Sequence, residues 1–261
     1  MTSDWLKELW SYRELFYFLV WRDVKVKYKQ SLLGVGWAVI QPLFAMIIFS
    51  LFFGRFAQVP SDGIPYPVFV YSALVIWTYF ASAVAFSATS LVMNTNLITK
   101  VYFPRVALPF ASVFSGLVDV GMASVLLLAL MAYYGIAFTW WLLLSPLFVF
   151  SLVLLAAGVG MILASLNVRY RDVKYVVPFG IQLWLFVSPV IYPVSIVPEQ
   201  YRPLLALNPV TGIVDGFRAC VFPTRHFDWQ LIGMSLLVTL LVFTGGAVYF
   251  RRTERWFADI I

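Results

Sequence analysis

The stretch WRDVKVKYKQSLLGVGWAVIQP, residues 21–42, passes from a positively charged segment into an apolar run. Its first half carries four basic side chains and one acid, namely Arg22, Lys25, Lys27, Lys29 and Asp23. From Ser31 to Gly54 the chain contains no charged residue. Lys and Arg are in excess on the cytoplasmic flanks of membrane helices. We therefore expect the chain to enter a membrane from its cytoplasmic face at this junction.

The composition of the whole chain predicts a membrane protein. Of its 261 residues, 62% are hydrophobic and 11% are charged, whereas soluble domains have about 45–50% apolar and about 25% charged residues. The net charge of +6 comes from short basic blocks between apolar runs. That arrangement favours contact with anionic lipid headgroups over binding to nucleic acid. The single cysteine, Cys220, excludes an internal disulfide and is expected to be a packing residue.

Six apolar stretches predict six transmembrane helices in one domain, residues 1–261. At ~1.5 Å per residue, each is long enough to cross a hydrocarbon core of ~30 Å. Their expected bounds are about 34–54, 67–92, 106–134, 141–166, 176–197 and 231–250. The third stretch is long, so we expect a tilt or a broken start at Pro109. The predicted fold class is an all-α polytopic membrane protein.

Further helical features are expected outside these spans. Residues 4–20 carry aromatic and apolar side chains on one side at helical spacing, which predicts an N-terminal amphipathic helix in the membrane interface. A soluble helix packed on a partner is the alternative. The basic stretch 22–29 alternates with a period of two but also suits a helix, so its structure stays open. Residues 198–230 are interrupted by prolines and polar residues and predict re-entrant periplasmic helices between spans 5 and 6.

The distribution of Lys and Arg predicts the orientation. With both termini in the cytoplasm, the inner segments hold 14 basic residues and the outer segments hold 4, which are Arg55, Arg202, Arg218 and Arg225. This bias is typical of six spans with both ends inside.

Motifs for nucleotide, metal and nucleophile chemistry are absent from the sequence. It contains no GxxxxGK(S/T) loop for ATP phosphates, no HExxH or GxSxG, and one histidine, His226, expected on the outer surface. We therefore expect no catalytic site, metal or cofactor on this chain. Asp119 is the only acid within an apolar run. It marks either a conduit or a structural hydrogen bond to a neighbouring helix, because an ionisable group there costs about 2.5–3.5 kcal/mol on insertion scales.

Aromatic residues make up 18% of the chain, and some recur at helical spacing deep within the predicted spans. In span 1 the recurring positions are Trp37, Gln41, Phe44, Ile48 and Phe52, and in span 5 they are Trp184, Ser188 and Tyr192. Aromatic faces pack well against sugar rings, since apolar C–H groups meet the negative face of the π system. Contact with lipid is the alternative for each of these aromatic residues.

Four segments carry a resemblance to a known family. They are WRDVKVKYKQSLLGVGWAVIQPLF at 21–44, NTNLITKVYFPRVALP at 94–109, LNVRYRDVKYVVPFGIQLWLFVSPVIYP at 166–193 and LNPVTGIVDGFR at 207–218. In this order they resemble ABC-2 type permeases that export polysaccharides, in particular those for O-antigen and teichoic acid. The resemblance covers essentially the whole chain.

The resemblance implies a homodimer that binds two copies of a separate ATPase, which would hold ATP and Mg²⁺. It implies coupling helices in two cytoplasmic loops, about 94–102 and 167–174, with the docking residues Asn94, Asn96, Lys100, Arg169, Arg171 and Asp172. It also implies that 198–222 forms paired periplasmic gate helices, with Asn208, Asp215 and Arg218 as gate residues. The substrate would be a lipid-linked glycan that moves along the dimer axis in the bacterial inner membrane.

Under this resemblance the aromatic faces of spans 1 and 5 would line the glycan channel. The alternatives are an exporter of teichoic acid, or of a small amphiphile such as a drug. A membrane enzyme such as a lipid-linked sugar transferase needs acidic or metal-binding loop residues. The cytoplasmic loops offer Asp172 and little else, which disfavours that class.

Overall fold

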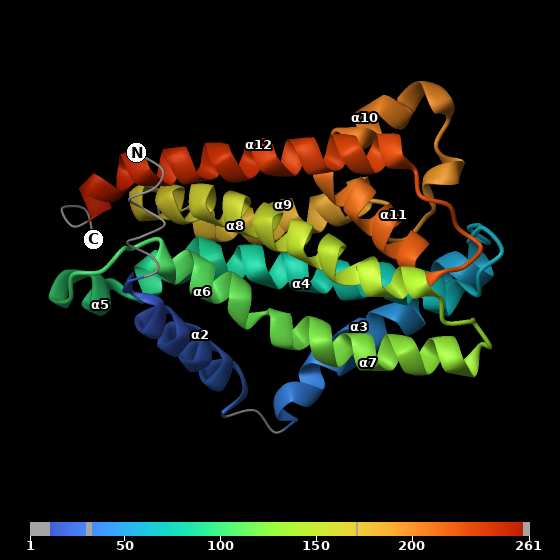
Figure 1. Ribbon diagram of the computed structural model, residues 1–261, viewed down its shortest axis with the longest axis horizontal. Helices are drawn as coiled ribbons and strands as arrows, with labels where there is room; N and C mark the ends of the chain where they lie inside the picture. Colours follow the sequence, from blue (N-terminus) through green and yellow to red (C-terminus); the bar gives the residue numbers. More distant parts are fainter. Residues whose placement is uncertain (1–10, 30–32, 171, 258–261) are drawn as a thin grey trace.

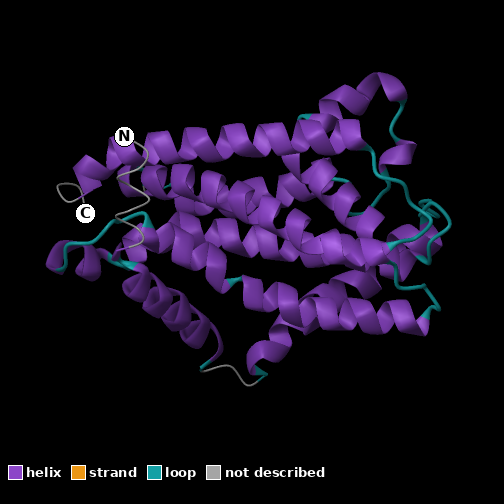
Figure 2. Ribbon diagram, in the orientation of Figure 1, coloured by secondary structure: helices purple, strands orange, loops and turns teal. Residues whose placement is uncertain are grey.

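The computed structural model describes residues 11–29, 33–170 and 172–257, and within these ranges it contains helices and loops but no strand (Figure 2). The long helices lie side by side along the long axis of the molecule (Figure 1). The all-α fold class predicted from the sequence is therefore confirmed.

Within the described ranges, five helical stretches are long and apolar enough to cross a membrane. They are η1–α3–η2 (Gly34–Gly36, Trp37–Phe49 and Ser50–Phe56), α4 (Tyr66–Met93), α6–α7 (Ala107–Ser115 and Leu117–Tyr133), η3–α8 (Trp140–Leu144 and Ser145–Arg169) and α12–η6 (Trp229–Thr253 and Glu254–Trp256). These stretches confirm that the predicted spans 34–54, 67–92, 106–134, 141–166 and 231–250 are apolar helices, with ends displaced by a few residues.

Helix α4 forms the centre of the bundle. In its most apolar stretch 78% of the residues are buried, against 11% for the first span. Small residues let neighbouring helices approach closely: a Cβ added at Gly160 of α8 would lie 2.7 Å from the Cβ of Ser87 in α4. Small residues are favoured at such contacts in lipid, because lipid tails are as apolar as the helices and association depends on close packing.

The prediction of a continuous fifth span at 176–197 is wrong. Helix α9 covers Val173–Val187, and its 15 residues at ~1.5 Å each give about 22 Å, less than a ~30 Å hydrocarbon core. Beyond it the chain is irregular apart from the short turn η4 (Val194–Ile196). Pro189 and Pro193 explain the early end, because proline lacks the backbone N–H that a helix interior needs.

The third span is broken, but at Gly116 rather than at the predicted Pro109. Pro109 lies in the first turn of α6, where its missing N–H has no intrahelical partner to lose. At Gly116 helix α6 ends and α7 begins. A Cβ added there would lie 3.0 Å from the ring of Tyr79 in α4, so the break falls where the chain passes tightly against the central helix.

The N-terminal helix extends beyond its predicted end. Of the predicted helix 4–20, the part up to residue 10 lies outside the described residues, and α2 (Arg13–Tyr28) continues through the basic stretch that the sequence left open. The helix packs on α6: the rings of Phe16 and Phe114 have centroids 5.6 Å apart in an edge-to-face arrangement. Leu19 is 1% exposed in a core cluster shared with α4, α6 and α12.

Residues 199–221 form a bent pair of helices. The short η5 (Glu199–Tyr201) and α10 (Arg202–Ala206) meet α11 (Pro209–Val221) at an angle of 103°. Every residue of α11 is buried, and the helix contacts α4, α8 and α12. This is the geometry of a broken span or a re-entrant loop. The predicted half-helices are therefore present, and the side of the membrane on which they lie stays a prediction.

Candidate functional site

The loops that carry the predicted docking residues lie at one end of the bundle, together with the start of α2 and the end of α12 (Figure 1). We call this the inner end; it includes the short helix α5 (Thr95–Lys100) and the turn between α8 and α9. The connections predicted to face outward gather at the opposite end, which we call the outer end. These segments lie at two separate ends, as the charge distribution predicted, whereas Lys27 near the end of the basic stretch pairs with Asp119 inside the third span. Which end faces the cytoplasm stays a prediction.

The first docking segment is α5 and the residues that flank it. Ile98 is 6% exposed and packs into the core, whereas Asn96 and Lys100 are exposed. Asn94 precedes the helix, but its Nδ2 donates to the carbonyl of Ser90 at 2.7 Å and does not cap α5. The segment therefore presents an amide and an ammonium group at the inner end.

The prediction of a separate second coupling helix at 167–174 is wrong. Helix α8 continues to Arg169 and α9 begins at Val173, so a tight turn connects them. Asn167 does not face a partner. It is buried in α8, and its Nδ2 donates to the carbonyl of Ala88 in α4 at 3.0 Å. Its role is to fasten α8 to the central helix.

The remaining residues of this turn are available for docking. Arg169 and Asp172 are both exposed, and the Arg169 guanidinium lies 5.2 Å from the centroid of the Tyr170 ring. Arg171 lies outside the described residues. The structure thus leaves one exposed cation and one exposed anion of the predicted set at the turn.

A contact that the sequence did not indicate joins the first docking segment to α12. The Arg105 Nη1 donates to the backbone carbonyl of Glu254 at 2.7 Å, and the Arg105 backbone N–H donates to Glu254 Oε1 at 3.0 Å. A hollow of about 390 Å³ beside this contact is lined in part by Tyr102, Arg251 and Arg255. The inner end is therefore a connected, basic surface and not a set of independent loops.

Asp119 in α7 binds two side chains at the end of α2. Its carboxylate forms an ion pair with the Lys27 ammonium and accepts a hydrogen bond from the Tyr28 hydroxyl. Burial, and secondly the hydrogen bond to Asp119, raise the pKa of Tyr28 well above its usual range, so the hydroxyl stays a donor. The structural hydrogen bond expected for Asp119 is therefore present, and its conduit role stays a prediction.

The predicted aromatic face of span 1 is present on α3 and η2. Trp37, Phe44 and Phe52 are 51%, 60% and 54% exposed, and Gln41 is exposed between them. Trp37 and Gln41 also border a hollow of about 530 Å³ beside Asp119. Exposure along one helix face suits either a glycan path or contact with lipid, so the lining role stays a prediction.

The predicted face of span 5 does not form, because α9 ends at Val187, before Ser188 and Tyr192. Trp184 instead donates its Nε1–H to Asn208 Oδ1 at 2.9 Å. Asn208 in turn donates from Nδ2 to Ser188 Oγ, also at 2.9 Å. Ser188 is fully buried, so it lines no surface of this chain. These contacts fasten the end of α9 to the start of α11.

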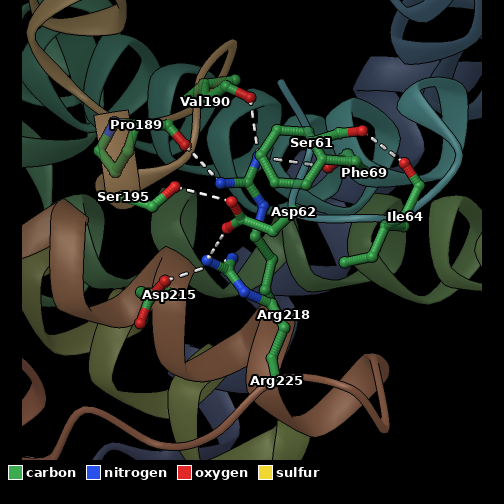
Figure 3. A network of polar contacts seen from close by, with 10 residues as sticks. All are labelled: Ser61, Asp62, Ile64, Phe69, Pro189, Val190, Ser195, Asp215, Arg218 and Arg225. Carbon is green, nitrogen blue, oxygen red and sulfur yellow. Dashed lines mark hydrogen bonds and ion pairs between the residues drawn. The ribbon is translucent and has the colours of Figure 1, made fainter. Parts of the chain in front are cut away.

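Arg218, a predicted gate residue, is fully buried at the outer end (Figure 3). Its guanidinium donates to the carbonyls of Pro189 at 2.6 Å, Val190 at 2.8 Å and Phe69 at 3.2 Å. It also lies 3.7 Å from the centroid of the Phe69 ring, a cation–π contact. Arg218 therefore ties α11 to α4 and to the irregular segment after α9.

Asp215, a second predicted gate residue, belongs to a chain of ion pairs (Figure 3). Arg225 lies 3.3 Å from Asp215 and 2.8 Å from Asp62. Asp62 also accepts a hydrogen bond from Ser195 at 2.7 Å. Sequence reasoning treated Arg225 as an outer charge and did not single out Asp62. The available signal was the PSDG turn at 60–63, which places an acid in an outer loop that carries little positive charge.

The titratable side chains outside these networks do not gather. Among residues 11–29, 33–170 and 172–257 there is no group of three or more His, Cys, Asp or Glu side chains placed to hold a metal ion. Cys220 is buried in α11, as expected of a packing residue. His226 is exposed in the connection between α11 and α12, at the outer end.

Several apolar helices of membrane-spanning length, with polar turns at one end and a buried bent pair toward the other, define the class of multi-pass membrane proteins. The ABC-2 type transporter family matches residues 14–222, and the chain belongs to this family. The resemblance that the four sequence segments carried is thereby confirmed.

Relatives with named roles extend over nearly the whole chain. The protein is similar to the O-antigen export system permease protein RfbA of Myxococcus xanthus, with 30% identity over 260 residues, 98% of each chain. An RfbA of Klebsiella pneumoniae is 29% identical over 92% of each chain. The polysialic acid transport protein KpsM of Escherichia coli is 25% identical over 89% of this chain and 91% of its own.

Proposed function

We propose that this chain is the transmembrane permease subunit of an exporter that moves lipid-linked polysaccharide from the cytoplasm across the bacterial inner membrane. A separate ATPase would bind at the inner end and supply the energy. One observation carries the proposal: end-to-end similarity to O-antigen export permeases, on a bundle whose exposed docking turns lie together at one end.

The docking surface consists of Asn96 and Lys100 in the first docking segment and of Arg169 and Asp172 in the α8–α9 turn. All four are exposed at the inner end. Exposed charges of this kind suit a soluble partner, because they steer association and set its register. ATP and Mg²⁺ would be held by the ATPase, since the sequence has no phosphate-binding GxxxxGK(S/T) loop.

The exposed face of α3 and η2 supports a glycan path between two copies of the chain. Only 11% of the residues in the most apolar stretch of this span are buried. A two-fold axis would place two such faces, each with Trp37, Gln41, Phe44 and Phe52, opposite one another. Several weak stacking contacts suit a moving polymer, because a single tight site would retain it.

The bent pair would form the gate at the outer end. Asn208 links α11 to α9, Arg218 links it to three backbone carbonyls, and Asp215 links it through Arg225 to an outer loop. These contacts hold α11 in a buried position. Opening would require them to move together.

Charge reversal at the docking surface tests the proposal. We expect Lys100→Glu and Arg169→Glu to abolish copurification with the cognate ATPase and to remove the glycan from the cell surface. Arg55→Glu applies the same change at an exposed outer position and is the matched control. Intact assembly and export in both docking variants would contradict the docking assignment.

The substrate class and the orientation have separate tests. Deletion of the gene is expected to remove surface glycan; unchanged glycan with altered drug sensitivity would assign a small amphiphile as the substrate. Tags at the two chain ends are expected to be protected from protease added outside intact spheroplasts. Cleavage of both tags under that treatment would reverse the topology.

A further inference from the structure

Both docking segments are attached to one pair of helices. Arg169 is the last residue of α8 itself. Glu254, which directly follows α12, holds Arg105, just beyond the first docking segment, through hydrogen bonds of 2.7 and 3.0 Å. A displacement of either docking segment therefore acts on α8 or on α12.

Helices α8 and α12 touch backbone to backbone near their middle. A Cβ added at Gly158 of α8 would lie 2.7 Å from the Cα of Phe243 in α12. A Cβ added at Gly246 of α12 would lie 3.0 Å from the carbonyl carbon of Gly158. Sliding one helix past the other would make atoms overlap, because protein interiors are packed as densely as crystals. We call this unit the α8–α12 pair.

The gate helix, α11, packs equally closely against the outer half of the α8–α12 pair. Helix α11 contains GIVDG, whose glycines, Gly212 and Gly216, lie one turn apart on one face. A Cβ added at Gly212 would lie 2.6 Å from the carbonyl oxygen of Leu231 in α12. One added at Gly216 would overlap the ring of Phe148 in α8 and lie 2.5 Å from its Cζ atom. The Gly212 N–H also donates to Ser235 Oγ of α12 at 3.0 Å.

Other residues of α11 hold the outer segments. Arg218 binds the carbonyls of Pro189 and Val190, and Asp215 pairs with Arg225 (Figure 3). The gate helix therefore lies between the α8–α12 pair and the segments that close the outer end. A displacement of α11 would reach those segments directly.

We propose that the α8–α12 pair is a rigid strut that carries displacement from the docking segments to the gate helix. Glu254, Gly212 and Gly216 are positioning residues in this scheme: they fix the two ends of the strut and touch neither nucleotide nor glycan. Packed side chains, hydrogen bonds and rigid helices in contact with one another carry coupling between distant sites. A loose contact at either end of the strut would absorb the motion. The inference rests on the proposed function, because it takes the inner end as the ATPase site.

The only cysteine of the chain supplies a reporter on the gate helix. Cys220 lies in α11 and is fully buried, so its thiol should react with a polar maleimide only when α11 moves. The complex with the cognate ATPase is placed in lipid nanodiscs, and labelling of the permease is timed with and without ATP. We expect ATP to raise the labelling rate by about fivefold or more, the lower end of ordinary coupling between sites.

Two variants test the two ends of the strut. Glu254→Ala removes the carboxylate that accepts the Arg105 backbone N–H, and Gly212→Ala adds one methyl group at the α12 contact. The matched controls are Glu14→Ala, exposed on α2, and Gly233→Ala, where an added Cβ meets no atom within 4 Å. We expect both test variants to bind the ATPase and hydrolyse ATP but to lose most of the ATP-dependent rise in labelling. Both controls should keep it.

The outcomes separate the strut from the proposed function. A full ATP-dependent rise in Glu254→Ala and Gly212→Ala overturns the strut and leaves the exporter standing. A wild-type complex that hydrolyses ATP with no rise in labelling also overturns it. Failure of the wild type to bind the ATPase refutes the proposed function and the strut with it. If Gly212→Ala does not fold, the result for Glu254→Ala decides alone.

Discussion

Replacing Arg218 by methionine should weaken the outer end of the bundle strongly. Methionine is unbranched and of similar reach but donates no hydrogen bond, so the carbonyls of Pro189, Val190 and Phe69 lose their partner in a buried site. A hydrogen bond from a charged group contributes about 1.5–3 kcal/mol in water-soluble proteins. Between helices in a bilayer the average is nearer to 0.6 kcal/mol.

For the three bonds of Arg218 these two values bracket a loss of about 2–9 kcal/mol. The net loss of free energy is smaller, because the variant no longer bears the cost of a desolvated charge. We therefore expect Arg218→Met to lower the free energy of unfolding by about 3–5 kcal/mol, a large share of the ~5–15 kcal/mol that holds a native domain. Arg218→Lys should lose about half as much, since an ammonium keeps the charge but lacks the planar fork.

Thermal unfolding in detergent measures this effect through the midpoint at which the monodisperse peak is lost in size-exclusion chromatography. Arg202→Met is the matched control, because its side chain is 45% exposed at the outer end. The control should change stability by no more than about 0.5 kcal/mol. Equal midpoints for the two variants would show that the carbonyl contacts of Arg218 contribute nothing to stability.

Three further changes test the packing and the internal polar contacts. Gly158→Ala places a methyl group against the α12 backbone and should lower the free energy of unfolding by about 1–3 kcal/mol. Gly245→Ala places it in open space and should leave that free energy unchanged or raise it by up to about 1 kcal/mol. Thermal unfolding compares the two variants. Asp119→Leu should destabilise more than Asp119→Leu combined with Lys27→Met, because the single change leaves a part-buried ammonium without its partner; a double-mutant cycle measures the difference. Asn208→Ala should lower the free energy of unfolding by about 1–2 kcal/mol, since the Asn208 side chain caps α11 and binds the end of α9. An unchanged unfolding midpoint would show that these hydrogen bonds are dispensable.

The predicted spans succeed where apolar residues run without interruption. The stretches at 67–92 and 231–250 became helices with nearly the predicted ends. Insertion into lipid depends on the sum of contributions from single residues, so a local count suffices there. The stretch at 176–197 scored as apolar in the same way, but Pro189 and Pro193 stop the helix early. Hydropathy predicts whether a segment prefers lipid or water. It contains no information on the backbone hydrogen bonds that proline removes.

The predicted site residues divide according to how much they depend on distant neighbours. Asn96 and Lys100 are exposed at the inner end, as their sequence context indicated. Asn167 has the same composition signal but is turned into the bundle, where a carbonyl of α4 accepts its hydrogen bond. Ser188 and Trp184 similarly bind Asn208 and do not share an exposed face. A polar residue near a helix end can serve either purpose, and the facing helix decides which.

The sequence by itself determined that this chain spans a membrane many times, which connections lie together at each end, and to which family it belongs. Hydropathy and charge act residue by residue, so the spans and the two ends can be read without a fold, whereas the family follows from the resemblance of four sequence segments. Only the tertiary structure brought Arg105 to Glu254 across 149 positions and Arg225 to Asp62 across 163. Such contacts depend on how closely helices from distant parts of the chain can pack, and that is set by small residues whose partners no local pattern reveals.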